Sequence, residues 1–345
     1  MRILLCLFRG SLALLIANVC SEGRLIAATT TNGSQEVLRV ATPADSQLRP
    51  TLMGEQPENV FPIVRSDLEI QIALAREGFS SGSIDGIRGA QTVAALKAFQ
   101  EREQLAPSGD FDEPTQARLV LRPPALGRVI VSKEDLARLQ LLPVTWLGKS
   151  EQKTLEYETI LELLAERSHA SPSLLRRLNP GVDWNQVTAE TSLIVPAVEL
   201  SSVPGKAARL YIRLAEHVLE ARSADGRLIA HFPVSIARMA EKRPEGELRV
   251  TVVIPDPNYT FDPAVFPESE EGRHLARKLV LPAGPNNPVG VAWIGLDRAG
   301  YGIHGTPLPE LIGRTESHGC FRLANWDAQA LLKLAWAGMP LLVEP

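Results

Sequence analysis

Hydrophobic residues recur at helical spacing in the early part of the chain. Apolar positions on one face predict helices over three stretches: 68–76, 92–100 and 114–120. In the second stretch, Val93, Leu96 and Phe99 lie three residues apart and should face a small core. Glycines that favour turns, such as Gly78 and Gly86, stand between the first two stretches. A small helical unit is therefore expected over 61–122.

The pattern changes in the middle of the chain, over 129–199. Amphipathic spacing followed by an apolar run predicts two helices and then a strand: 157–167, 171–178 and 192–196. Ser171 is a suitable helix cap and Pro172 a suitable first helical residue. The run Asn179-Pro180-Gly181 should end that helix. This part is therefore expected to be a small α+β unit.

Apolar and polar residues alternate through most of the last part, 206–345. The alternation predicts strands over these stretches: 208–214, 217–221, 228–236, 248–254, 289–296, 301–304 and 341–343. Asp225-Gly226 is a hairpin signal between two of them. One helix, capped by Asn325, should precede the last strand. We expect a mostly-β barrel or sandwich with one or two short helices.

Length and composition fit this division. The chain has 345 residues, too many for one ordinary core, and 26 prolines and 25 glycines suit short domains joined by loops. Hydrophobic residues make up 45% and charged residues 22%, as in globular proteins. The net charge of −4 and the lack of a Lys/Arg run give no support for nucleic-acid binding.

The first residues predict export. Arg2 precedes an apolar stretch over 4–16, and small residues follow at Ala27-Ala28, so 1–28 is interpreted as a signal peptide. A lipid anchor at Cys20 is the alternative, although Asn18-Val19 before it is a poor lipoprotein sequence. Residues 29–60 are polar and lack periodicity, which predicts a flexible leader.

Export would leave one cysteine. Two of the three cysteines, Cys6 and Cys20, fall inside the predicted signal, so cleavage leaves Cys320 without an internal disulfide partner. Cys320 is then either an inert buried thiol or a reactive one. Its neighbours favour reactivity, because Ser317-His318-Gly319 precede it and Phe321-Arg322 follow.

Acyl transfer by a thiol needs a base and donors for the oxyanion. Two histidines compete for the base: His318, two residues before Cys320, and His304, on another predicted strand. Gly319 allows a sharp turn that leaves backbone N–H groups free to face the developing negative charge. The residues alone leave the choice between the two histidines open.

These motifs resemble the signature of the L,D-transpeptidase catalytic domain, the YkuD family. The resemblance rests on His304-Gly305-Thr306 and 317–322, with Cys320 standing 16 positions after His304. Upstream, 242–246 resembles a family loop and 282–295 the segment leading into the site. It covers essentially 207–345.

The resemblance implies roles for individual residues. Cys320 would be the nucleophile, His304 the base, and the Gly305 carbonyl the partner that fixes the imidazole tautomer. Gly319 and Cys320 would supply oxyanion N–H groups. Three further residues would have supporting roles. His318 would shape the pocket, and Arg322 would hold a substrate carboxylate or brace the loop. Ser317 would be structural. No cofactor or metal is expected.

The two earlier parts also carry resemblances. The first resembles the three-helix peptidoglycan-binding domain through residues such as Ile84-Asp85-Gly86, Phe99-Gln100 and Gly109. The second resembles the back half of a LysM domain, a glycan-binding module, through 174–180 and 193–196. Its front strand is expected over 144–147, further away than that pattern requires, so this part is either a glycan binder or a spacer.

Together the resemblances imply an exported, wall-associated L,D-transpeptidase of the periplasm or cell envelope. It would form a thioester with a peptidoglycan stem tetrapeptide, release D-alanine and cross-link stems on the glycan strands. Transfer to water, or to an envelope protein, would use the same thioester. A non-catalytic wall-binding protein, a zinc site at His304, His318 and Cys320, and a general cysteine protease are weaker alternatives, since the reactive pair is present and the zinc and protease spacings do not match.

Overall fold

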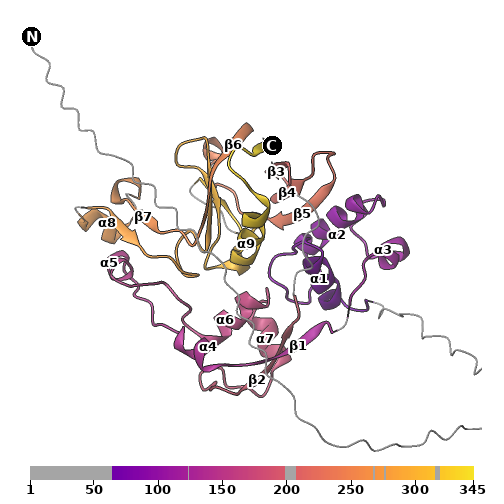
Figure 1. Ribbon diagram of the computed structural model, residues 1–345, viewed down its shortest axis with the longest axis horizontal. Helices are drawn as coiled ribbons and strands as arrows, with labels where there is room; N and C mark the ends of the chain where they lie inside the picture. The colour runs from indigo at the N-terminus through magenta and orange to yellow at the C-terminus, as the bar shows by residue number, and fades with distance from the viewer. Residues whose placement is uncertain (1–63, 123, 199–206, 267–268, 276, 315–318) are drawn as a thin grey trace, which may run out of the picture. The chain divides into compact units, whose positions relative to one another are not determined.

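The computed structural model describes three consecutive parts of the chain, coloured from indigo to yellow in Figure 1. The described ranges are 64–122, 124–198, 207–266, 269–275, 277–314 and 319–345. The predicted signal and leader lie outside them. The described residues fall within one compact unit, Pro57–Pro345. In these ranges, every helix is too short or too polar to span a bilayer.

The first part consists of helices, as the periodicity predicts. They are α1 (Asp67–Arg76), α2 (Ala90–Arg102) and α3 (Glu113–Arg118). Ser66 and Glu69 form a capping box at the start of α1, in which each side chain accepts from the other's backbone N–H. The rings of Phe79 and Phe99 meet edge to face at 5.9 Å, which fixes α2 against the loop after α1.

The middle part is bounded by two antiparallel strands, β1 (Leu126–Ile130) and β2 (Ser192–Pro196). Between them in sequence lie α4 (Lys133–Ala137), α5 (Trp146–Ser150), α6 (Ile160–Arg167) and α7 (Pro172–Leu178). The predicted helices, strand and Ser171 cap are confirmed. The strand predicted over 144–147 is wrong. Thr145 accepts a hydrogen bond from the Gly148 N–H and begins α5, while β1 pairs with β2 instead.

An eight-stranded sheet forms the third part, in the order β11-β10-β9-β6-β12-β3-β4-β5. Its strands are β3 (Arg209–Arg213), β4 (Val218–Arg222), β5 (Leu228–Pro233), β6 (Gly246–Pro255), β9 (Ala292–Leu296), β10 (Gly302–His304), β11 (Phe321–Arg322) and β12 (Pro340–Glu344). The β10–β11 and β12–β3 pairs are parallel. The expected mostly-β fold is confirmed, including the turn between β4 and β5, where Gly226 has φ +85°.

A second hairpin projects from the segment between β6 and β9. Strands β7 (Tyr259–Phe261) and β8 (Leu279–Leu281) pair antiparallel, and the short helices η2 (Pro263–Val265) and α8 (Glu270–His274) lie between them. The middle part packs on this hairpin at two points. Trp146 stacks on Phe261. Just after the hairpin, the Leu155 N–H donates to the Ala283 carbonyl at 2.9 Å, and the Leu155 carbonyl accepts from the Asn286 N–H at 3.0 Å.

Helix α9 (Asn325–Leu334) lies beside the strands of the sheet (Figure 1). The prediction that Asn325 caps it is wrong, because Ala324 occupies the cap position and Asn325 is the first helical residue. The Asn325 side chain is fully buried and makes its hydrogen bonds away from the helix. The Asn325 side chain therefore connects α9 to other parts of the chain instead of capping the helix.

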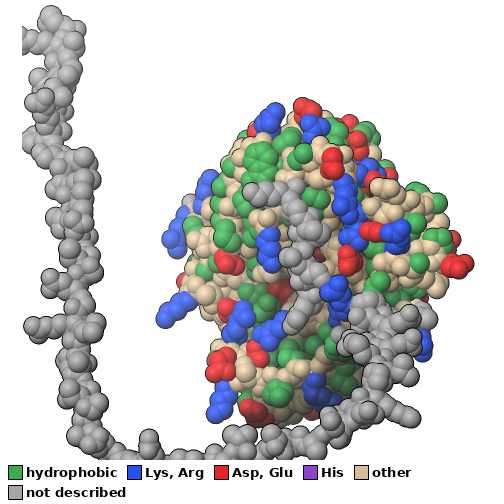
Figure 2. Space-filling view, turned by 45° about the vertical axis from the view of Figure 1, so that its right-hand side comes forward, with side chains coloured by type: hydrophobic (Ala, Val, Ile, Leu, Met, Phe, Trp, Pro, Cys, Tyr) green, Lys and Arg blue, Asp and Glu red, His purple; other side chains and the backbone are tan. Residues whose placement is uncertain are grey.

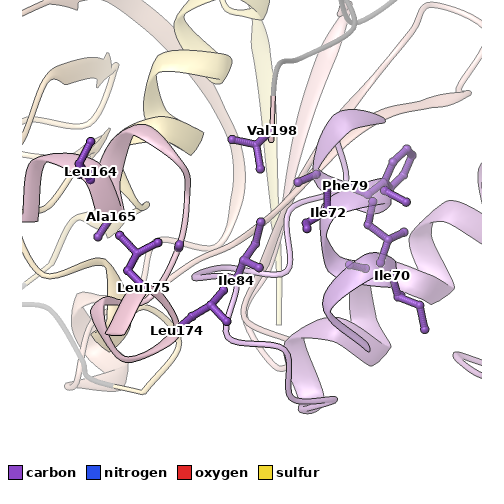
Figure 3. Packing of buried hydrophobic residues seen from close by; sticks show 14 of the residues in the cluster. Ile70, Ile72, Phe79, Ile84, Leu164, Ala165, Leu174, Leu175 and Val198 are labelled. Atoms are coloured by element: carbon purple, nitrogen blue, oxygen red, sulfur yellow. The ribbon is translucent and has the colours of Figure 1, made fainter. Parts of the chain in front are cut away.

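The first and middle parts share a hydrophobic core, while the sheet and α9 enclose another. Figure 3 shows Ile84 of the first part beside Leu174 and Leu175 of α7. The Ile84 N–H donates to the His169 carbonyl at 2.8 Å, and the Ile84 carbonyl accepts from the Ser171 N–H at 2.9 Å. The division into the predicted domains stays a prediction.

Candidate active site

His304 ends strand β10, where its imidazole is buried. Its Nδ1 atom lies 2.7 Å from the carbonyl oxygen of Gly305. Because a carbonyl only accepts, Nδ1 carries the proton and Nε2 is left as the acceptor. Burial lowers the pKa of His304 to about 4, although the bond to Gly305 partly offsets this. At neutral pH the imidazole is therefore uncharged, with Nε2 unprotonated.

Cys320 is a free thiol that immediately precedes strand β11. Since β11 runs parallel to β10 and Arg322 pairs with His304, the same register sets Cys320, the residue before β11, level with Gly302 at the start of β10. The Cys320 thiol donates to the Gly300 carbonyl at 3.5 Å. Burial raises the pKa of the thiol, and the Gly302 N–H and Arg322 partly offset the rise. The resting group is thus a thiol, which needs a base.

One cavity of about 590 Å³ is lined by both reactive side chains. Gly319 and Arg322 also line it, as does Lys242 from the loop predicted at 242–246. Ser317 and His318 lie outside the described residues. The structure thus brings together Cys320, His304, Gly305, Gly319 and Arg322.

Arg322 is fixed by its backbone on both sides. It exchanges two 2.9 Å hydrogen bonds with Ser235, while its strand pairs with β10. Arg322 lines the cavity near Tyr259, whose pKa burial raises to about 12. A guanidinium in this position is suited to a carboxylate of a bound peptide.

Asn325 packs against the glycine that follows His304. Its Oδ1 atom accepts from the Val291 N–H at 3.3 Å, and a Cβ added to Gly305 would lie 2.2 Å from that oxygen. At Gly290 the corresponding distance is 2.0 Å. Asn325 therefore requires glycine at both positions and packs directly against the residue whose carbonyl orients His304.

Aromatic residues that the motifs did not indicate form much of the cavity wall. They are Trp146, Tyr259, Phe261, Phe266 and Trp293. Trp146 comes from α5 in the middle part and stacks on Phe261, with ring centroids 4.4 Å apart and an 11° angle between planes. Glu271 accepts from the Trp146 and Leu147 N–H groups at 2.7 and 2.8 Å, which fixes the start of α5. No local pattern could have indicated this contribution.

Among the described residues, no group of three His, Cys, Asp or Glu side chains is placed to hold an ion. Figure 2 shows acidic and basic side chains interspersed on the visible face.

Two family models match the chain. Residues 207–343 match the L,D-transpeptidase catalytic domain (YkuD), and residues 68–119 match a peptidoglycan binding domain. Both matches confirm the resemblances found from the motifs. The LysM-like interpretation of the middle part stays a prediction.

The chain is also similar to individual proteins. The L,D-transpeptidase YkuD of Bacillus licheniformis is 27% identical over 194 residues, covering 54% of this chain and 93% of that protein. YqjB of Bacillus subtilis, also named as an L,D-transpeptidase, is 30% identical over 124 residues. The match covers 34% of this chain and 61% of that protein. The solved L,D-transpeptidase of Xylanimonas cellulosilytica is 16% identical, covering 84% of this chain and 100% of that one, with a TM-score of 0.33.

Proposed function

Residues 207–343 are an L,D-transpeptidase catalytic domain, and we propose that its nucleophile is Cys320 and its base His304, acting on peptidoglycan stem peptides. The observation that carries the proposal is the shared cavity, in which a protonated thiol and a neutral imidazole lie together. The peptidoglycan-binding domain at 68–119 supports the choice of substrate.

The first step forms a thioester. His304 Nε2 takes the thiol proton while Cys320 Sγ attacks the carbonyl carbon between the diamino acid and the terminal D-alanine. The new S–C bond leaves negative charge on the oxygen, which the Gly319 and Cys320 N–H groups stabilise. The C–N bond then breaks, the imidazolium returns its proton to the departing amine, and D-alanine leaves.

The second step transfers the acyl group. The amine of a second stem peptide attacks the thioester, its proton passes to His304, and the S–C bond breaks to restore the thiol. A cross-link is the product. Water in place of the amine gives a shortened stem, and an amine of an envelope protein gives attachment of that protein to the wall.

Four residues assist in this scheme. Arg322 binds a carboxylate of the stem peptide or braces the loop, since its backbone is held by Ser235 while its side chain lines the cavity. His318 shapes the pocket and Ser317 supports the loop. The Gly305 carbonyl keeps the proton of the resting imidazole on Nδ1, so that Nε2 is the atom that accepts the thiol proton in this scheme.

The substrate implies where the chain works. A domain that binds peptidoglycan and a domain that processes it suit the cell wall or envelope. We place the mature chain in the periplasm, after removal of the predicted signal over 1–28. Sequencing the N-terminus of the exported protein tests this, and an N-terminus at Met1 would contradict it.

Purified disaccharide-tetrapeptide distinguishes the products. The chain is incubated with it and the products are read by mass spectrometry, in parallel with Cys320→Ala, His304→Ala and the surface control Ser223→Ala. We expect an acyl adduct on Cys320 and a cross-linked dimer, neither of them in Cys320→Ala. A shortened stem alone would identify hydrolysis instead, and an active Cys320→Ala would exclude the thioester.

A further inference from the structure

Helix α6 of the middle part lies beside α9 (Figure 1) and places two carboxylates against the catalytic domain. Glu162 and Glu166 stand one helical turn apart, and each accepts a hydrogen bond from an asparagine. Asn286 Nδ2 donates to Glu162 Oε1 at 2.6 Å, and Asn325 Nδ2 donates to Glu166 Oε2 at 2.9 Å. The middle part therefore holds the catalytic domain at two points, and the second of them leads to His304.

The Asn325 amide has one orientation that suits its surroundings. Its Nδ2 atom faces two acceptors, Glu166 Oε2 and the Pro285 carbonyl at 3.1 Å. Its Oδ1 atom faces the Val291 N–H and lies against Gly305. Because a carboxylate only accepts, Glu166 keeps the NH2 group on the side of α6. The amide oxygen is thereby kept on the side of Gly305.

The position of Gly305 decides how the catalytic base is oriented. Its carbonyl oxygen lies 2.7 Å from His304 Nδ1 and holds the ring proton there. Space at this glycine is so limited that an added Cβ would lie 2.2 Å from Asn325 Oδ1. A turned amide would replace this oxygen by a larger NH2 group and displace the Gly305 carbonyl from Nδ1. The orientation of the amide therefore controls the tautomer of the imidazole.

The charge on Glu166 sets the strength of its hold on the amide. Tyr157 Oη donates to Glu166 Oε1 at 3.1 Å, so both carboxylate oxygens accept. Burial raises the pKa of Glu166 to about 7. Neighbouring groups alter this pKa in both directions: upward Glu162, and downward Asn325, Tyr157 and Arg138. Hydrogen bonds to an ionised acceptor are roughly twice as strong as those to a neutral one, so protonation of Glu166 weakens its bond to Asn325.

We propose that Glu166 is a positioning residue for the catalytic base, acting on His304 through Asn325 and Gly305. The ionised carboxylate fixes the amide, the amide fixes the Gly305 backbone, and the carbonyl keeps the ring proton on Nδ1. Glu166 does not line the cavity at Cys320, so it acts without contact with the stem peptide. The proposal rests on the proposed function for the role of His304.

The pH dependence of acylation tests the role of the charge. Acylation of Cys320 by the tetrapeptide is followed by mass spectrometry in single turnovers from about pH 5.5 to 8. His304 stays neutral in this range, since its pKa is about 4, and burial raises the pKa of the thiol. The wild-type rate should therefore rise about tenfold with a midpoint near pH 7, as Glu166 ionises.

Three variants give this rise its meaning. Glu166→Gln keeps the shape without the charge, so it should react about tenfold more slowly than the wild type at pH 8 and show no step. Tyr157→Phe removes a donor to Glu166, so the midpoint should move to higher pH. Glu134→Gln, at an exposed carboxylate of α4, is the matched control and should keep the wild-type profile.

The tautomer of His304 is read without any substrate. In chains carrying isotope-labelled histidine, NMR should show the proton on Nδ1 in the wild type and a mixture of tautomers in Glu166→Ala. His304→Ala identifies the signals. A loss of stability alone would leave the wild-type tautomer in the folded molecules.

A wild-type rate without a step near pH 7, a step that survives in Glu166→Gln, or an unchanged tautomer in Glu166→Ala would each overturn the proposal. Failure of the proposed function looks different. Cys320 would then remain unacylated at every pH, while the tautomer of His304 would still respond to the loss of Glu166.

Discussion

Asn325 Nδ2 donates to Glu166 Oε2 over 2.9 Å, which joins the first residue of α9 to helix α6 in the middle part. The other face of the same amide packs against Gly305, whose carbonyl orients the His304 ring. Burial raises the pKa of Glu166 to about 7. A side chain outside the catalytic domain therefore reaches the imidazole through two intermediates.

Asn325→Ala should slow acylation of Cys320 by more than about tenfold and lower the free energy of unfolding by about 1–3 kcal/mol, since several buried groups lose their partner. Acylation is followed by mass spectrometry and unfolding by denaturant. Asn325→Asp separates positioning from stability, because it sets a second carboxylate beside Glu166. Its acylation should fall more steeply with rising pH than that of the wild type. Identical pH profiles would contradict a positioning role, and Asn185→Ala serves as the surface control.

Alkylation of Cys320 by iodoacetamide should be slow at neutral pH and accelerate with a midpoint above the ordinary thiol value of about 8.5. The reason is that burial raises the pKa of this thiol. Rates are measured from pH 6 to 10 by mass of the adduct. A midpoint below about 7.5 would mean that the resting enzyme already holds a thiolate and an imidazolium.

Asp327 should make the fold less stable as the solution becomes alkaline. Its carboxyl accepts from Ser80 Oγ at 2.9 Å, but burial raises its pKa to about 8. The folded state therefore keeps a proton that the unfolded state has lost, and this stability disappears as pH rises through 8. Between pH 7 and 9 we expect a loss of about 1 kcal/mol in the wild type.

Asp327→Asn should remove that loss. His169, near the same carboxyl, has a pKa lowered by burial to about 4, so it affects stability only on the acid side of this window. Unfolding by urea at several pH values checks the prediction. Equal slopes in the two proteins between pH 7 and 9 would contradict it.

Trp146→Ala should raise KM for the stem peptide several-fold with a smaller change in kcat. The substitution removes one wall of the cavity at Cys320 and the stack on Phe261, a contact worth about 0.5–1.5 kcal/mol beyond its buried area. Steady-state release of D-alanine measures it. Trp336→Ala, at a tryptophan that is 48% exposed and absent from the cavity lining, is the matched control. Equal KM values for the two variants would argue against a contact with substrate.

Gly290→Ala should destabilise the chain by more than about 2 kcal/mol. Gly290 has φ +61°, and a Cβ there would lie 2.0 Å from Asn325 Oδ1 and 2.7 Å from the Gly305 backbone. Gly181→Ala, with open space around it, is the control and should be nearly neutral. Thermal unfolding compares the two, and a shift of similar size in both would show that the crowding has no energetic effect.

The residues that could be predicted are those with local signals. His304, Gly305, Cys320 and Arg322 stand in two short motifs, and the structure places all four at one site. Periodicity also located the helices and most strands, because each buries one face. These signals do not depend on which distant segment packs against them.

What could not be predicted depends on long-range contacts. Trp146 and Glu166 belong to helices whose local pattern records burial but not the partner. The run at 144–147 has strand-forming residues, yet Thr145 caps a helix that Glu271 holds from far along the chain. The sequence predicted Asn325 as a cap because a polar residue precedes an apolar run. Its buried amide instead donates to Glu166 and packs against Gly305.

The backbone bonds of Leu155 limit how far the catalytic domain can be treated as a transplantable module. A fragment of residues 206–345 would retain Cys320 and His304, yet it would leave the Ala283 carbonyl and the Asn286 N–H without their partner in Leu155. Phe261 and Asn325 would likewise lose Trp146 and Glu166. Domain shuffling or fusion of this enzyme should therefore keep the middle part, 124–198, together with the catalytic domain.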